Sequence, residues 1–314
     1  MKIFFQNTLL KLLCLAFMLG GGSAFAQEEK TEDSDWEKKF IEGNIAISEW
    51  FDGVADGLDL FLAGKRVTSR KNESFVRLES TAASSEGKAV VNTFGITVVP
   101  RLPNLEEYWH LKFATYDERE DKRNAKNAYL RQTPRQRNPG ATVGVFRKLG
   151  DVRTSFEPRI DLQDPLKVSH SLNFESIARQ KGYEINPKLE LYADPEKGVG
   201  SFQALNFHFG LTKIYSLTLL NQGDYLEKTH LYTVNNGVSI GHILDSKRAL
   251  SYNVIFTSNN QPSYRLIAYN LSVAYSQVLY KRILDFSIVP NLDFQTHVQY
   301  KGVAGITFNI NLNF

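Results

Sequence analysis

The chain has very little cysteine and no long apolar run. Among 314 residues the one cysteine is Cys14, close to the N-terminus. This excludes a small domain held together by disulfides, and it excludes cysteine-based metal and redox chemistry. No stretch reaches the roughly 20 apolar residues that a helix needs to cross a bilayer. The fold is therefore held neither by disulfides nor by helical membrane spans.

The chain also lacks an excess of charge of either sign. Its 37 Lys and Arg residues stand against 34 Asp and Glu residues, and the mean hydropathy is −0.29. A nearly balanced charge creates no strong field, so nucleic acid is not expected as a partner. A low mean hydropathy fits a soluble protein, but it fits equally a membrane barrel with a polar lumen. The pattern along the chain has to decide between them.

Residues 1–26 have the pattern of a secretory signal peptide. A basic start is followed by an apolar core and by the small-residue exit Ala24-Phe25-Ala26. The apolar core is too short to span a membrane as a helix. We expect the mature chain to begin at Gln27.

Residues 27–72 are expected to form a periplasmic segment that is flexible at first and then helical. Residues 27–35 are charged and rich in glutamate, which is typical of a flexible terminus. Apolar residues then recur at three- and four-residue spacing up to a helix end near Gly64, although Gly53 and Gly57 weaken the pattern. One or two amphipathic helices are predicted here.

From residue 73 to residue 314 the apolar period becomes two. In residues 205–211, leucine and phenylalanine alternate with Asn206, His208 and Gly210. Such alternation places an apolar row on one face of a strand and a polar row on the other. The same pattern recurs in residues 185–191, 267–276 and 284–288, so residues 73–314 are predicted to form a β-domain.

Short and long connections alternate between the predicted strands. Short links are expected near residues 101–106, 149–151, 179–182, 211–213, 245–248 and 280–282. Longer links are expected at residues 117–139, 161–167, 194–198, 222–226, 259–263 and 294–301. Short turns on one rim and long loops on the other are typical of a closed antiparallel transmembrane β-barrel, here with about fourteen strands. If Asn236-Gly237 is a hairpin turn, twelve or sixteen strands are the neighbouring even solutions.

The last strand is apolar at every second residue back from the terminus. Phe314, Leu312, Ile310, Phe308 and Ile306 share one face, and polar residues occupy the other. This strand resembles the terminal recognition strand of bacterial outer-membrane β-barrel proteins, which ends in an aromatic residue. The resemblance implies insertion into the cell outer membrane with both termini in the periplasm. It also implies periplasmic chaperones, the barrel-assembly machinery, outer-membrane lipid and lipopolysaccharide as partners.

No cluster of polar residues gives a strong indication of a catalytic or metal-binding site. His170 lies beside Ser171, loosely resembling the histidine and serine of outer-membrane phospholipase, but alternation puts the two side chains on opposite faces of one strand. The remaining barrel histidines lack the spacing of a metal site, so no metal or cofactor is expected. Residues 117–137 hold seven basic and four acidic residues, which predicts a solvated extracellular loop or, alternatively, contact with lipopolysaccharide phosphates.

Charged residues on the polar face of the strands give the clearest functional signal. The alternation turns six of them toward the lumen, where water or partner charges must surround them: Arg153, Glu157, Glu175, Lys188, Glu190 and Asp285. The leading hypothesis is a passive, porin-like channel for small hydrophilic solutes. An outer-membrane lipid-modifying enzyme with His170 or His230 as base, and a structural or adhesive barrel, are the alternatives.

Overall fold

The alternating segments form strands that hydrogen-bond into a closed ring. The computed structural model describes residues 35–63, 74–100, 109–126, 135–280 and 283–314, without the side chains of residues 35–37 and 56–63. The predicted signal peptide lies outside these residues. In chain order the strands are β1 (Phe75–Ser85), β2 (Val91–Val99), β3 (Trp109–Ala114), β4 (Gly140–Leu149), β5 (Val152–Asp161), β6 (Lys167–Ser176), β7 (Ala178–Gln180), β8 (Tyr183–Asp194), β9 (Gly198–Gly210), β10 (Tyr215–Leu226), β11 (Leu231–Ile243), β12 (Arg248–Asn259), β13 (Arg265–Tyr280), β14 (Leu284–Gln295) and β15 (Val303–Asn313).

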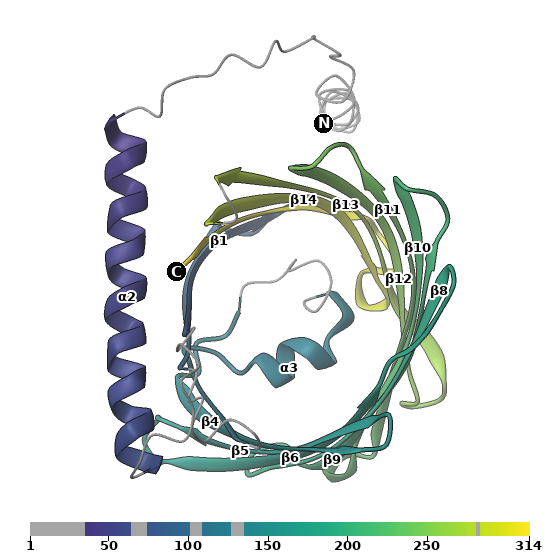
Figure 1. Cartoon of the computed structure of the whole chain (residues 1–314). Coiled ribbons are helices and arrows are strands. Elements are labelled where there is room, and N and C mark those ends of the chain that lie inside the picture. The colour runs from purple at the N-terminus through teal and green to yellow at the C-terminus, as the bar shows by residue number, and fades with distance from the viewer. Residues whose placement is uncertain (1–34, 64–73, 101–108, 127–134, 281–282) are drawn as a thin grey trace. The chain divides into compact units, whose positions relative to one another are not determined.

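The ring closes where the first strand meets the last. All pairings are antiparallel, and β1 pairs both with β2 and with β15, for example through Leu78 and Leu312. Figure 1 shows the ring that the strands form. β6 and β7 both pair with β8, so they are two parts of one strand interrupted at Ile177. The described residues therefore form a closed barrel of fourteen strands, as the sequence predicted. β11 runs unbroken through Asn236 and Gly237, which excludes the hairpin alternative.

Among the predicted links that the structure describes, one is wrong; the link at residues 101–106 and most of the link at 280–282 lie outside the described residues. Residues 222–226 continue β10, and the turn consists of η1 (Glu227–Thr229) followed by His230 in the left-handed conformation with φ 52°. The polar side chains of Gln222 and Asp224 suggested a loop. They belong instead to the inward row of a strand, and Gln222 is buried.

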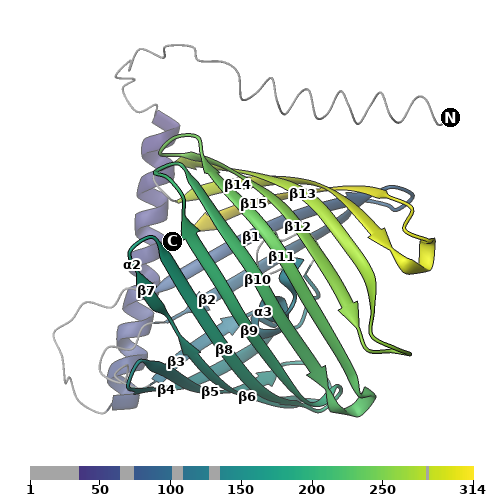
Figure 2. The ribbon, with the colours of Figure 1, turned by 90° about the vertical axis from the view of Figure 1, so that its right-hand side faces the viewer.

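Many polar side chains of this barrel are buried and many large apolar ones are exposed, which is the reverse of a soluble protein. The side chains that are most completely buried include Arg159, Glu190, Asn270 and Asn309. Large apolar side chains are exposed on the outer face of the same strands, as Phe156 is on β5. The strands run obliquely side by side (Figure 2). Polar inside and apolar outside is the arrangement that a bilayer requires of a transmembrane barrel.

One helix, α2 (Asp35–Ala63), precedes the barrel. It confirms the predicted helical segment and begins close to the point where the apolar spacing starts. Asn44 Nδ2 donates a hydrogen bond to the Asn313 carbonyl oxygen (3.0 Å), and the Ser74 backbone N–H donates to Asp52 Oδ1 (2.7 Å). Among the described residues, no helix is long and apolar enough to span a membrane.

Candidate functional site

The chain leaves the barrel wall after β3 and enters the lumen. β3 ends at Ala114, which pairs with Gly140 at the start of β4, and the Asn138 N–H donates to the Thr115 carbonyl oxygen (2.8 Å). The residues between form a loop whose helix α3 (Glu118–Arg123) lies inside the ring (Figure 1). We call residues 115–139 the lumen loop; residues 127–134 of it lie outside the described part. The predicted solvated extracellular loop is therefore wrong for the part that the structure describes.

The first residues of the lumen loop are held by a buried cluster of charged residues, which we call the latch: Asp117, Arg119, Arg159 and Asp161. Asp117 caps α3 by accepting from the Arg119 N–H (3.0 Å), and its carboxylate also accepts from Arg119 Nη2 (3.0 Å). Arg119 Nη2 reaches the wall at Ser169 Oγ on β6 (2.6 Å). Arg159 on β5 has 2 % of its side chain exposed; its Nε lies 2.7 Å from Asp161 Oδ1 and 3.9 Å from Asp117 Oδ2. The latch thus joins the loop to two strands of the wall.

The arginines of the latch lower the pKa of Asp117. Burial opposes its charge, but the hydrogen bonds and charges of Arg119 and the charge of Arg159 outweigh burial and hold the pKa of this carboxyl below its ordinary value. Because the folded pKa lies below the unfolded value of about 3.9, ionised Asp117 stabilises the latch above that pH. This stabilisation is lost as the pH falls through the folded pKa.

We therefore expect acid to loosen the lumen loop only below about pH 4. In bilayer recordings, current noise should stay constant from neutral pH to about pH 5 and rise at lower pH. Asp117→Asn should be noisy already at neutral pH, because the neutral amide loses most of the attraction of Arg119 and Arg159. The same acid transition in Asp117→Asn and in the parent would exclude Asp117 as its origin.

Farther along the loop, Arg123 contacts the wall at β8. Its Nη1 lies 3.2 Å from Glu190 Oε1, and its guanidinium carbon lies 3.9 Å from the centre of the Tyr192 ring. Glu190, of whose side chain 1 % is exposed, also lies 3.4 Å from Lys188 Nζ. Tyr192 donates its hydroxyl to Asp224 Oδ1 on β10 (2.8 Å). The Glu190 carboxylate can be buried because the cations of Arg123 and Lys188 pair with it.

The loop then reaches the opposite wall. Lys126 forms an ion pair with Asp293 on β14, which also accepts from Asn270 Nδ2 on β13 (3.0 Å). Ala125 is packed against Ile255 on β12 and Ala274 on β13. Contacts with β5, β6 and β8 at one end and with β12, β13 and β14 at the other show that the loop crosses the lumen.

The returning part of the loop is held at β1. Arg135 forms an ion pair with Glu79, and its Nε lies 2.6 Å from Asp121 Oδ2. Its guanidinium stacks 3.8 Å from the centre of the Tyr116 ring, and the Tyr116 hydroxyl donates to Glu79 Oε2 (2.9 Å). Burial and the neighbouring carboxylates raise the pKa of Tyr116 above its ordinary value, so the phenol remains a neutral donor. The loop is thus held at both ends and at the far wall.

The six residues predicted to line the lumen lie on inward rows of their strands, and three of them belong to contacts with the loop. Lys188 and Glu190 belong to the contact with Arg123 described above. Glu157 accepts from Ser155 Oγ (2.7 Å), and its carbonyl oxygen accepts from Arg119 Nη1 (3.2 Å).

The other three predicted residues make contacts within the wall. Arg153 lies over the Phe146 ring, with 4.6 Å from its guanidinium carbon to the ring centre. Glu175 accepts from Asn186 Nδ2 (3.0 Å). Asp285 accepts from Asn311 Nδ2 (2.5 Å). Arg153 and Glu175 are direct partners in the register of β5 and β6, whereas Asp285 lies on β14, which is not a neighbour of these strands.

Sequence reasoning did not single out Glu79, Arg159, Asp161 and Asp293, which hold the loop. Arg159 and Asp161 follow Arg153 and Glu157 on the same alternating row of β5, and Asp293 follows Asp285 on β14. The alternation could have found these three. Their link to the loop could not be read from spacing.

The histidines considered as catalytic bases lie apart from the loop. His170 is on the outer face of β6, stacked on Phe156 with 5.9 Å between ring centres, whereas its neighbour Ser171 is buried on the inner face. His230 lies in the turn after η1, where its Nδ1 is 3.2 Å from the Tyr225 hydroxyl. Within the described ranges, no three His, Cys, Asp or Glu residues are grouped so that they could hold a metal.

The predicted assembly strand closes the barrel. Phe308 and Ile310 are exposed on the outer face of β15, and Leu312 continues their row next to Leu78 and Leu284. Phe314 follows the strand, and its backbone exchanges hydrogen bonds with Val76 (2.8 and 3.2 Å). The terminal residue is therefore part of the seam between the first and last strands.

No family model matches the chain, and no curated protein matches it. Among solved structures, the KdgM porin is 8% identical with a TM-score of 0.38, over 76% of this chain and 99% of that one. The loop L8 deletion mutant of OmpT from Vibrio cholerae is 7% identical (TM-score 0.47; 78% and 99% covered). The outer membrane channel DcaP of Acinetobacter baumannii is 6% identical (TM-score 0.46; 78% and 97% covered). All three scores lie below 0.5, so the fold rests on the strand order and register given above.

Proposed function

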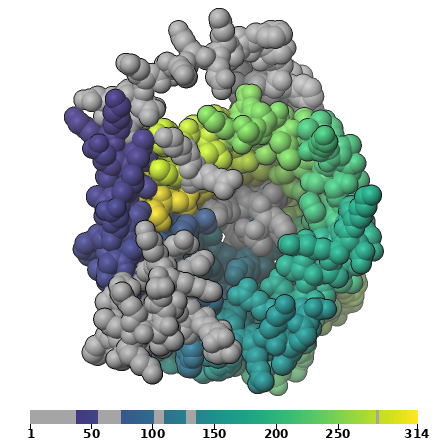
Figure 3. Space-filling model, viewed as in Figure 1, coloured from purple at the N-terminus to yellow at the C-terminus, as the bar shows by residue number. Residues whose placement is uncertain are grey.

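We propose that this protein is an outer-membrane channel for small hydrophilic solutes, narrowed by the lumen loop. The observation that supports it best is the loop itself, which crosses a polar lumen and is bound to the wall by ion pairs. Apolar outer rows and a polar interior fit a bilayer around the strands. The ring is hollowed on the face seen in Figure 3. The lumen-facing charges, including the six predicted ones, would surround passing solute.

The outer membrane is the proposed location because the strands of a barrel pair their backbone groups with one another and need no helical spans to cross a bilayer. The N-terminus of β1 and the C-terminus of β15 lie at one end of the barrel, since Val76 pairs with Phe314. We place this end in the periplasm. Lipopolysaccharide and outer-membrane lipid would then surround the apolar rows.

The channel is tested by adding purified, folded protein to planar lipid bilayers. We expect stepwise, ohmic increases in current whose size varies with salt concentration. A membrane that stays silent, although the protein runs as a folded, heat-modifiable band on gels, would contradict conduction. The two alternative functions are not favoured: His170 and Ser171 lie on opposite faces of β6, and the described part of the loop is inside.

The assembly role of β15 gives a separate prediction. Deleting Phe314 removes two backbone hydrogen bonds with Val76 and one aromatic side chain, a loss of about 1 to 3 kcal/mol of burial that is too small to unfold a barrel of this size. We expect a several-fold loss of membrane-embedded, heat-modifiable protein, because the assembly machinery no longer recognises the strand. Phe314→Tyr is the matched control and should insert normally. Equal amounts of parent and truncated protein at low expression would show that the terminal residue is not a signal.

A further inference from the structure

In the part of the chain that the structure describes, β2 pairs with β3 along only part of its length. Among the described residues, Thr97 and Val98 are the members of β2 that pair with β3. Thr115 adds one more contact, donating its N–H to the Ile96 carbonyl oxygen (3.0 Å), before the chain turns into the lumen. Residues 91–95 of β2 therefore pair with β1 on one side and face no described strand on the other. We call the edge formed by residues 91–95 the β2 notch.

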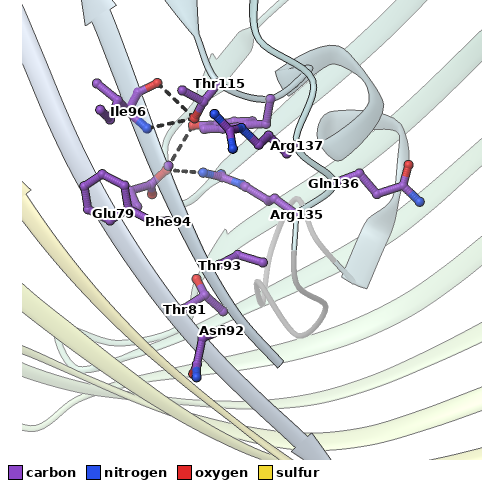
Figure 4. Close-up of a pocket in the computed structure, with 12 residues that line it drawn as sticks. Glu79, Thr81, Asn92, Thr93, Phe94, Ile96, Thr115, Arg135, Gln136 and Arg137 are labelled. Atoms are coloured by element: carbon purple, nitrogen blue, oxygen red, sulfur yellow. Dashed lines mark hydrogen bonds and ion pairs between the residues drawn. The ribbon is translucent and has the colours of Figure 1, made fainter. Parts of the chain in front are cut away.

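A cavity of about 410 Å³ lies at the notch (Figure 4). Glu79, Thr81 and Thr93 line it from inward rows of β1 and β2. Phe94 and Ile96 line it from the outward row of β2. Since residues of both rows of β2 line it, the cavity lies at the edge of this strand.

On the outer side the cavity is lined by an apolar side chain of an outward row. Phe94 pairs with Ser80, Ser80 pairs with Ile310, and Ile310 pairs with Phe286. All four side chains are in one outward row, in which Phe94, Ile310 and Phe286 are apolar. Phe94 is 60% exposed. A molecule on this side would meet apolar surface.

The inner part of the cavity is polar and carries a positive excess. Its lining includes one carboxylate, Glu79, and two guanidinium groups, those of Arg135 and Arg137. Arg135 is bound to Glu79 and Asp121. Arg137 is exposed and has no ion-pair partner among the residues that the structure describes. The hydroxyl groups of threonines in the lining add neutral hydrogen-bonding groups beside this cation.

We propose that the notch binds one amphiphile with an anionic headgroup. The headgroup enters the cavity and is bound by Arg137, while the alkyl chain runs outward along Phe94. A volume of about 410 Å³ holds a headgroup and the first part of a chain but not a whole lipid. The site goes beyond the proposed channel function and does not depend on it, because a closed barrel that conducts no current would have the same notch.

Binding is measured with dodecyl phosphate as the probe, by native mass spectrometry of the full-length protein from uncharged detergent. We expect one bound molecule per chain. Arg137→Gln should weaken binding about tenfold, since a charge-assisted hydrogen bond is lost. Phe94→Ser should weaken it as well, because the alkyl chain loses its contact. Arg147→Gln, which changes an exposed arginine of β4 outside the cavity lining, is the matched control and should bind like the parent.

Two further probes separate the sources of affinity. Inorganic phosphate bound as tightly as dodecyl phosphate would overturn the proposal, because the site would then take a free anion. Dodecanol bound as tightly would also overturn it, because the charge would not be recognised. Equal weakening by Arg137→Gln and Arg147→Gln would show nonspecific attraction. Heat-modifiable migration on gels establishes that each variant is folded before binding is compared.

Discussion

Replacing residues 116–137 by the two-residue turn Asn-Gly should raise the single-channel conductance roughly threefold, because the segment that crosses the lumen is removed. The design uses contacts that already exist. Thr115 and Asn138 are joined by a backbone hydrogen bond and Ala114 pairs with Gly140, so a tight hairpin turn can connect β3 to β4. Conductance is recorded in planar bilayers beside the parent protein.

A matched control shortens a link that does not enter the lumen. Replacing residues 260–264, between β12 and β13, by the same Asn-Gly turn leaves the lumen loop in place. This control should conduct like the parent. If the two shortened variants gave the same current, the lumen loop would not be what limits conduction.

Removing the charge of Arg159 should cause the largest loss of stability among single substitutions in the latch. Arg159→Met leaves Asp161 and Asp117 buried without this cation, and breaking a buried ion pair from one side costs about 3 to 5 kcal/mol. The barrel should lose its folded gel mobility at a temperature clearly below that of the parent. Open-channel noise should increase, because the first residues of the loop are released.

Arg248→Met is the matched control for this substitution. Arg248 pairs with Asp245 at 2.6 Å, but their side chains are 46% and 39% exposed, and an exposed ion pair contributes at most about 1 kcal/mol. The control should therefore melt within a few degrees of the parent. Similar losses in both variants would mean that burial of the latch does not determine its strength.

The fold could be predicted to a large extent from the sequence because the bilayer imposes a strict alternation. The polar row of β9, with Asn206 and His208, and the terminal row of β15 predicted the faces of the strands, and the alternation of short and long connections predicted about fourteen strands. The error at residues 222–226 has the same origin. Gln222 and Asp224 are polar because they face the lumen, and the sequence alone does not separate an inward row from a loop.

The lumen loop could not be placed from sequence because its partners are distant along the chain. Arg135 is bound to Glu79, Arg123 to Glu190, and Lys126 to Asp293 on a strand more than 160 residues later. A segment rich in charges of both signs is typical of a solvated surface. Only the closure of the barrel brings buried carboxylates within reach of these cations and makes the lumen the favourable place for the loop.

The most direct test of the central claim, that the lumen loop crosses the inside of the barrel, is the reactivity of a cysteine placed at Ala125. Ala125 is 1% exposed and packed against Ile255, whereas Gln261 lies exposed in the link between β12 and β13. With Cys14 replaced by Ser in both proteins, Ala125→Cys and Gln261→Cys are treated, folded, with a bulky maleimide. We expect Gln261→Cys to react at once and Ala125→Cys to react slowly until the protein is denatured. Equally fast labelling of both folded proteins would contradict a loop held across the lumen.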